Sequence, residues 1–322
     1  MTVLNGKNPL EGFVHDALFY RGLREFLRSV VGTIRAGMFL GEPMLVAVPG
    51  QKIGPLRAEL GSAAERVRFV DIVEAGRNPS RIIPNVLTAF ADANAGHRVR
   101  MVGEPIWPDR SSDEYATAVQ HEALINIAFR GRSATIVCPY DAEGLGSEAV
   151  RDAMRTHPTL VSDNERWESL AYGEPGEVAK ASLEPLSEPS STQRTLVFTC
   201  HSDLASVRSL VSEEARRAGM EADKINDLRL AVNEVATNTL AHTDGPGFLR
   251  IWRQEAALVC EVRDTGHISD PLVGRRRMPA DSDHGHGLML VNDVCDLVQI
   301  KQDPAATTVR LHMRCPPRTG AP

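Results

Sequence analysis

The sequence lacks the features that carry a chain into or across a membrane. Its longest uninterrupted apolar runs, such as residues 44–48, hold about five residues, whereas a membrane-spanning helix needs roughly 20. The first twenty residues have neither the basic start nor the apolar run and small-residue cleavage site of a secretion signal. These absences predict a cytoplasmic protein with no membrane partner.

Paired cysteines and broad basic surfaces are also missing. The net charge is −6, and positive charge is concentrated in the arginine triplet 275–277. A phosphate backbone needs a wider basic surface, so we expect no direct nucleic-acid partner. The cysteines show no C-x-x-C spacing, which argues against a disulfide framework or a zinc site. We expect reduced, mostly buried thiols at Cys138, Cys200, Cys260, Cys295 and Cys315.

What is present is a globular composition, 42% apolar and 24% charged, over 322 residues, which is enough chain for about two domains. Residues 173–193 mix proline with serine and glutamate and have no apolar period, which is typical of a linker. We therefore expect one domain over residues 10–172 and a second over residues 194–315.

The first domain alternates short apolar runs with amphipathic stretches, a pattern typical of an α/β domain with a mostly parallel sheet. We expect a helical opening over about residues 10–37, which carries His15. Strands are then predicted at residues 44–48, 67–71, 99–103 and 134–138, with helix-like segments between them.

The second domain has a different order of elements, which predicts an α+β two-layer sandwich. Residues 309–314 alternate between apolar and polar, as in a sheet with one buried face and helices on one side. The expected elements are a strand at 195–200, helices at 202–218 and 222–242, a hairpin of 248–253 with 257–264, a further helix and two strands.

The second of these helices carries Glu234 and Asn238, which lie one turn apart on one face. An amide oxygen suits Mg²⁺, and a carboxylate can orient or deprotonate a hydroxyl group. A solvated helix face explains the same pair without any function, so the spacing alone is weak evidence.

Three further signals follow along the chain. Asp264 ends a strand before Gly266, where an acceptor carboxylate can hold an exocyclic amine and a glycine lets the backbone approach a ligand. Gly285 and Gly287 precede a helix that opens with Leu288, which is a geometry suited to a polyphosphate. Thr307 lies early in the last strand. Ordinary turns and β propensity explain each of these residues equally well.

The segment between Asp264 and Gly285 is long for a connection, and we expect it to form a mobile lid. It contains Arg275, Arg276 and Arg277, whose guanidinium groups would order the lid over a polyphosphate. A solvated loop is the competing explanation.

The order of these signals is more specific than any one of them. Glu-x-x-x-Asn on a helix, Asp-x-Gly after a strand, Gly-x-Gly-Leu before a helix and a threonine in the final strand resemble the N, G1, G2 and G3 boxes of the GHKL ATPase superfamily. The stretch EARRAGMEADKINDLRLAVNEVATNTLAH resembles the anti-sigma-factor serine kinases within it. The resemblance covers residues 194–315.

This resemblance implies ATP and Mg²⁺ as cofactors. It implies that Asn238 binds Mg²⁺, that Glu234 is the base, that Asp264 reads adenine and that Thr307 supports the adenine end. The nucleotide pocket and lid would be shaped by Gly266, Gly285, Gly287 and Leu288. Many relatives have a second glycine where this chain has Ile268, a departure that bears on lid geometry and on phosphoryl transfer.

The implied partners are an anti-anti-sigma protein of the STAS type, a sigma factor, or both. The sequence leaves open whether the chain forms a homodimer. Two functions follow: a serine or threonine kinase that phosphorylates or sequesters a sigma-factor regulator, and a non-catalytic switch that uses ATP to fix a partner-binding conformation.

The first domain carries little recognisable chemistry. The loop at residues 50–54 follows a strand but lacks the GxxxxGK[ST] pattern of a phosphate loop. The separations of His15, His121, Cys138 and His157 match no metal-ligand spacing, so we expect packed or surface histidines and a buried thiol.

Residues 12–160, with His15, GEPMLVAVPG, NIAFRGRSATIVCPYD and THP, resemble the MEDS sensory domain, a degenerate RecA-like α/β module. The resemblance implies that the first domain controls the second, and makes His15 a candidate contact for a sensed small ligand. Together the two halves resemble the RsbA family of anti-sigma regulatory proteins.

Overall fold

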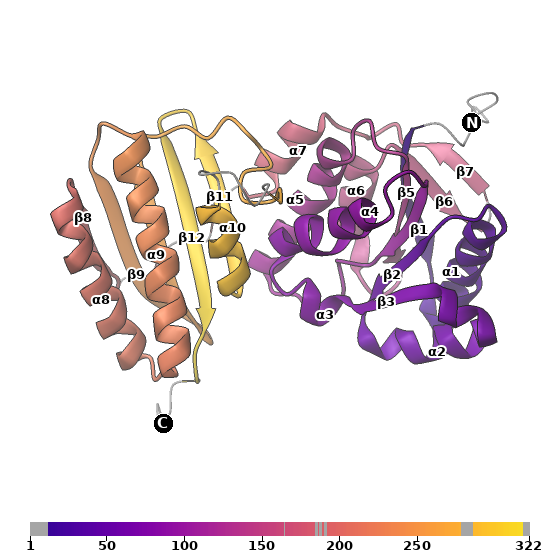
Figure 1. Cartoon of the computed structure of the whole chain (residues 1–322), viewed down its shortest axis with the longest axis horizontal. Helices are drawn as coiled ribbons and strands as arrows, with labels where there is room; N and C mark the ends of the chain where they lie inside the picture. Colours follow the sequence, from indigo (N-terminus) through magenta and orange to yellow (C-terminus); the bar gives the residue numbers. More distant parts are fainter. Residues whose placement is uncertain are drawn as a thin grey trace. The chain divides into compact units, whose positions relative to one another are not determined.

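The structure is a computed structural model that describes residues 12–163, 165–183, 186, 189, 192–277 and 286–317. The chain divides into two compact units between Ser182 and Leu183. This division lies inside the segment 173–193 assigned to a linker. Each unit is described by itself below (Figure 1).

The first unit is built on a seven-stranded sheet with the order β3-β2-β4-β5-β1-β6-β7, in which the pairing is parallel except between β6 and β7. This confirms the α/β class. The strands are β1 (Phe13–Tyr20), β2 (Met44–Val48), β3 (Val67–Asp71), β4 (Val99–Gly103), β5 (Ala134–Asp141), β6 (Thr159–Ser162) and β7 (Glu165–Glu168).

Helices cover the sheet on both faces (Figure 1), which is why β2 is buried along its whole length. Helix α5 begins with a capping box, in which the side chains of Ser111 and Glu114 each accept a hydrogen bond from the other residue's backbone N–H group. The helices are α1 (Gly22–Phe39), α2 (Gly50–Leu60), α3 (Ile72–Ala75), α4 (Ala89–Ala93), α5 (Ser112–Ala128), α6 (Gly146–Thr156) and α7 (Pro175–Ala181), with short 3-10 helices at Gly61–Arg66 and Pro79–Arg81 and a π-helix at Ile82–Thr88.

The prediction of a helical opening was wrong, because the unit begins with strand β1 and His15 lies on that strand. The strand is central, between β5 and β6. Its two polar residues, His15 and Asp16, are nevertheless buried, at 1% and 7% exposure. Polar residues at buried positions hide the apolar run by which a central parallel strand is normally recognised. The helix itself starts at Gly22, whose φ is +64°.

The first part of the predicted linker is helix α7, which belongs to the first unit. Glu174 caps it by accepting from the N–H of Glu177 at 2.8 Å. Val178 and Ala179 are buried, and the amide of Gln120 on α5 donates to the Ala179 carbonyl at 3.2 Å. Two apolar residues are enough to dock such a short helix, but too few to produce a periodic pattern in the sequence.

The second unit is an antiparallel five-stranded sheet with helices α8 and α9 side by side on one face (Figure 1). This confirms the α+β sandwich. Its strands are β8 (Arg194–Phe198), β9 (Gly247–Gln254), β10 (Ala257–Asp264), β11 (Leu297–Asp303) and β12 (Ala306–Arg314), in the order β11-β12-β10-β9-β8, and its helices are α8 (Leu204–Arg217), α9 (Ala222–His242) and α10 (Gly287–Val294), with a 3-10 turn at His201–Asp203.

The core of the second unit lies between the sheet and its helices. Val207, Leu228 and Val232 from the helices meet Leu249 and Leu311 from the strands, and all five are fully buried.

The opposite face of this sheet does not follow the prediction of one buried and one exposed face. Arg310 on β12 and Glu261 on β10 are 2% and 1% exposed. Glu261 accepts from Arg310 Nε at 3.0 Å and from Arg250 Nε on β9 at 2.8 Å. A carboxylate shared by two guanidinium groups compensates the charges that lie on this face.

Candidate nucleotide site

Helix α9 presents Glu234 and Asn238 toward the start of helix α10. Both side chains are half-buried at the rim of the core. A Cβ atom placed on Gly287, the first residue of α10, would lie 3.1 Å from Glu234 Oε2 and 3.7 Å from Asn238 Nδ2. The absence of a side chain at Gly287 therefore keeps the space in front of the carboxylate and the amide free.

Asp264 ends β10, and both of its carboxylate oxygens are held in place. Oδ2 accepts from Thr239 Oγ1 at 2.5 Å, and Oδ1 accepts from the backbone N–H of Gly266 at 2.8 Å. An ionised carboxylate has about four acceptor sites, so this one retains capacity for a further donor such as an amine. Gly266 is sterically required, because a Cβ there would lie 2.8 Å from Thr243 Cγ2 and 2.9 Å from Asp264 Oδ1.

Thr307 lies opposite Asp264 in the β10–β12 register. Its hydroxyl is 2.7 Å from both the Gly266 carbonyl and Gln302 Oε1. Gln302 also accepts from the N–H of Ile268 at 2.9 Å. Thr307 and Gln302 together hold the turn that follows Asp264, so Thr307 acts on the backbone around the carboxylate.

Helix α9 connects the Glu234–Asn238 pair with Asp264. Asn238 faces α10, while the next residue, Thr239, donates a hydrogen bond to Asp264. The sequence pattern did not single out Thr239 or Gln302 as residues of this site. An unusual polar residue in an apolar stripe is the signal that could have identified Thr239, which is 2% exposed. For Gln302 the sequence offers no comparable signal.

The segment after Asp264 folds back onto α10. Gly274 has φ +67°, and a Cβ there would lie 2.9 Å from Leu288 Cβ and 2.9 Å from Asn292 Nδ2. The Asn292 amide donates to the Gly274 carbonyl at 2.9 Å. Leu288 packs against the core of the unit, so it anchors the start of α10. Gly285 lies outside the described residues, as does the stretch 278–285 of the predicted lid.

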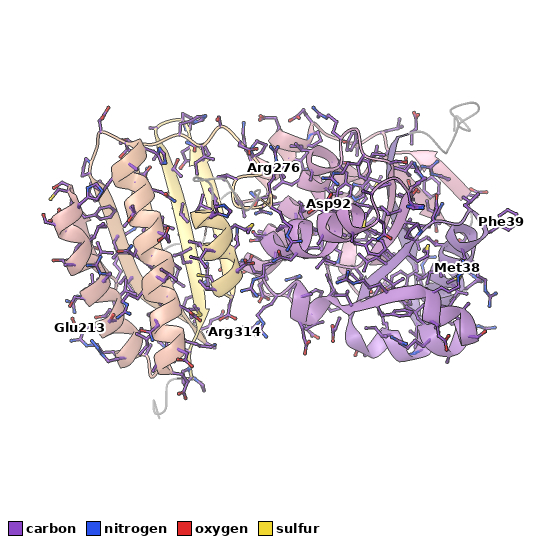
Figure 2. The ribbon with its side chains drawn as sticks, viewed as in Figure 1. Met38, Phe39, Asp92, Glu213, Arg276 and Arg314 are labelled. Carbon is purple, nitrogen blue, oxygen red and sulfur yellow. The ribbon has the colours of Figure 1, made fainter. Side chains whose placement is uncertain are left out.

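The arginine triplet is not uniformly solvated. Arg275 is 3% exposed, and burial lowers the pKa of its guanidinium to about 10. Arg276, labelled in Figure 2, is exposed and lies 3.5 Å from Asp270. Arg277 is also exposed. At most two of the three guanidinium groups can therefore act as the solvated phosphate contacts that the sequence suggested.

The loop after β2 in the first unit has its lysine engaged internally. Lys52 Nζ lies 2.6 Å from Glu104 Oε1 and 2.6 Å from the Tyr20 hydroxyl. Gly50 leaves room for Asp71, which accepts from the Gly50 N–H at 3.1 Å. In a phosphate loop the lysine ammonium and the backbone N–H groups point at the ligand. Here the Lys52 ammonium and the Gly50 N–H instead donate to the carboxylates of Glu104 and Asp71.

Four histidine and cysteine residues have sequence separations that match no metal-ligand spacing, yet three of them lie together in the structure. His15, Cys138 and His157 meet in the first unit, with Glu122 as the fourth member, and all are buried. His121 is not part of this group. His15 lies inside the packed interior, and its role as a contact for a sensed ligand stays a prediction.

All five cysteines are free, and Cys200 is the exposed one, in agreement with reduced, mostly buried thiols. Among the helices of the described residues, none has the length and apolarity to cross a bilayer.

Two family models match the chain. The model "MEDS: MEthanogen/methylotroph, DcmR Sensory domain" matches residues 14–158, and the model "Histidine kinase-like ATPase domain" matches residues 199–313. The serine-protein kinase RsbW of Halalkalibacterium halodurans is 31% identical over 109 residues, which cover 30% of this chain and 67% of that protein. The crystal structure of the RsbU and RsbW domains of Rv1364c from Mycobacterium tuberculosis aligns at 18% identity with a TM-score of 0.29, over 40% of this chain and 35% of that chain.

Proposed function

Because this chain belongs to the RsbW-like family of histidine kinase-like ATPases and carries a MEDS domain before its ATPase domain, we propose that it is an Mg-ATP-dependent serine or threonine kinase. Its substrate would be a sigma-factor regulator, an anti-anti-sigma protein of the STAS type, and the MEDS domain would control the reaction. The enzyme would reside in the cytoplasm.

The observation that carries this proposal is the convergence of Glu234, Asn238 and Gly287 beside the fixed carboxylate of Asp264. These residues come from α9, α10 and β10. Asn238 and Thr239 are consecutive on α9, so a phosphate end at Asn238 and an adenine end at Asp264 can belong to one nucleotide. A side chain at position 287 would press against Glu234 Oε2, so the glycine leaves room at the phosphate end.

Each residue would have a separate role. Asn238 would hold Mg²⁺ through its amide oxygen, and Glu234 would accept the proton of the substrate hydroxyl group. Asp264 would accept from the adenine amine, with Thr239 and Gly266 fixing its two oxygens. Gly287, Gly285 and Leu288 would shape the phosphate end. When bound, Mg-ATP supplies the phosphoryl group and the charge compensation for its transfer.

A second function is a switch that binds ATP without transferring phosphate. Ile268 favours it, because this residue stands where many relatives have a second lid glycine, and its N–H is bonded to Gln302. A bonded, β-branched residue restricts the closing motion that completes a phosphoryl-transfer site.

Incubation of the full chain with ATP labelled at the γ position and a purified anti-anti-sigma protein separates the two functions. Label on a serine or threonine of the partner is the result expected for the kinase. Complex formation that needs ATP, with no label on the partner, would support the switch. Absence of both ATP binding and complex formation would overturn both functions.

A further inference from the structure

Four side chains with metal-ligating atoms meet in the interior of the first unit. His15 lies on β1, Cys138 on β5, Glu122 on α5, and His157 directly follows α6. The β1–β5 register pairs Ala17 with Cys138, so His15 and Cys138 point to the same face of the sheet. Their ligand atoms all lie within 4.8 Å of one another, and all four residues are buried.

Four of the six separations among these ligand atoms are those expected around a tetrahedral zinc ion. Typical Zn–N, Zn–O and Zn–S bonds put neighbouring ligand atoms roughly 3.3–3.6 Å apart. Glu122 Oε2 lies 3.3 Å from the Nε2 atoms of both His15 and His157, and 3.3 Å from the Cys138 sulfur. The Cys138 sulfur lies 3.5 Å from His15 Nε2.

Outer hydrogen bonds fix the orientation of both imidazole rings. His15 Nδ1 lies 3.1 Å from Asn126 Oδ1, while the amide nitrogen of Asn126 donates to backbone carbonyls, including that of Thr156 at 2.8 Å. His157 Nδ1 lies 2.9 Å from the Ala153 carbonyl oxygen. His157 Nδ1 also lies 2.9 Å from Thr156 Oγ1, whose hydroxyl donates to the Asp152 carbonyl at 2.8 Å. The tautomer protonated at Nδ1 therefore satisfies the acceptors around both rings. In a neutral imidazole the remaining Nε2 atom then carries a lone pair, which is the arrangement found in metal-ligating histidines.

The centre of the cluster consequently lacks a positive charge. Two Nε2 lone pairs face a carboxylate oxygen, which is itself an acceptor. Within the described residues, His157 Nε2 and Glu122 Oε1 have no hydrogen-bond partner. Protonating both rings would place two buried cations side by side, with ring centroids 4.0 Å apart. One divalent cation satisfies the lone pairs, the carboxylate and the sulfur at once.

We propose that His15, Glu122, Cys138 and His157 bind one zinc ion in a closed, four-coordinate structural site. Binding forms one bond from each ligand to the metal and releases the proton of the Cys138 thiol to solvent. Two neutral imidazoles, a thiolate and a carboxylate balance the charge of Zn²⁺. The ion would join β1, α5, β5 and the end of α6, four separate segments of the chain.

The test uses the full chain, stripped of metal by a chelator and then titrated with Co²⁺ alone. We expect one cobalt ion per chain, with the visible bands of tetrahedral cobalt and a thiolate-to-cobalt charge-transfer band. Zinc should displace the cobalt. A native protein that gives no thiolate band, or binds cobalt only weakly in an octahedral form, would overturn the proposal.

Variants identify the ligands. Cys138→Ser should abolish the thiolate band and weaken zinc binding at least tenfold, whereas Cys260→Ser, which alters a buried free cysteine of the second unit, should leave both unchanged. His157→Ala should likewise weaken zinc binding, with exposed His201→Ala as its control. A thiolate band that survives Cys138→Ser would contradict the assignment, and the titration of the native chain does not depend on any variant folding.

Discussion

At the scale of single residues, Asn238 offers the sharpest test of the metal end of the proposed nucleotide site. Replacing it with alanine removes one of the few protein oxygens available to Mg²⁺, which normally keeps most of its waters. We expect Asn238→Ala to abolish Mg-dependent ATP binding in calorimetry. Asn233→Ala, on the same helix but bonded to Arg208, should bind ATP like the native chain. Unchanged Mg-ATP affinity in a folded Asn238→Ala protein would remove this residue from the site.

Asp264 tests the adenine end. The Asp264→Asn change keeps the shape of the side chain but weakens its acceptor for an amine, so ATP affinity should fall by about 1.5–3 kcal/mol if that bond is charged. Binding of GTP, which lacks the amine at that position, should change much less. Competition experiments with both nucleotides measure the difference, with Asp223→Asn at the exposed start of α9 as control. Equal losses for ATP and GTP would indicate a purely structural Asp264.

The buried Lys52–Glu104 pair makes a prediction about stability. Burial raises the pKa of Glu104, while Lys52, at 2.6 Å, acts in the opposite direction. Lys52→Met would leave Glu104 buried without its cation, which costs about 3–5 kcal/mol. Urea unfolding of the first unit should report this loss, and adding Glu104→Gln should recover part of it. As the control, Lys180→Met removes the exposed ion pair with Glu177 and should leave the urea midpoint of unfolding unchanged. Equal effects of the two lysine variants on this midpoint would contradict the account.

At the scale of elements, a substitution at Gly287 distinguishes the space that this residue leaves beside Glu234 from its effect on the stability of helix α10. Alanine is a better helix former than glycine, so Gly287→Ala should not destabilise α10, yet its Cβ would lie 3.1 Å from Glu234 Oε2. We expect weaker ATP binding with unchanged or higher thermal stability. Gly32→Ala in α1, where a Cβ meets nothing within 4 Å, should raise stability and leave ATP binding alone. Native ATP affinity in Gly287→Ala would show that the space beside Glu234 is not used.

The elements also show where sequence reasoning works and where it fails. The apolar pattern predicted α9, which buries a stripe of residues, and the strands β2 to β5, of which β2 is buried along its whole length. It missed β1, whose His15 and Asp16 are polar but buried, and α7, which docks through Val178 and Ala179 alone. Both depend on tertiary partners, namely Asn126 and Arg166 for the strand and Gln120 for the helix.

At the scale of the whole molecule, the candidate nucleotide site could be proposed from the sequence because its residues occur in a fixed order within the second unit. The structure brings Glu234 and Asn238 next to Gly287. The cluster of the first unit could not be predicted, because its members lie far apart in sequence and meet through the sheet register. Spacing rules detect ligands on one helix or loop, and this set comes from four segments.

The central claim is that the chain transfers phosphate with Glu234 as the proton acceptor. The most direct measurement is the initial rate of label transfer from γ-labelled ATP to an anti-anti-sigma protein, for the native chain and Glu234→Gln, with ATP affinity measured for both. We predict transfer by the native chain and a rate lower by roughly 10²–10⁴-fold in Glu234→Gln, at similar ATP affinity. Equal rates in the two proteins, or no transfer by a native chain that binds ATP, would contradict the account.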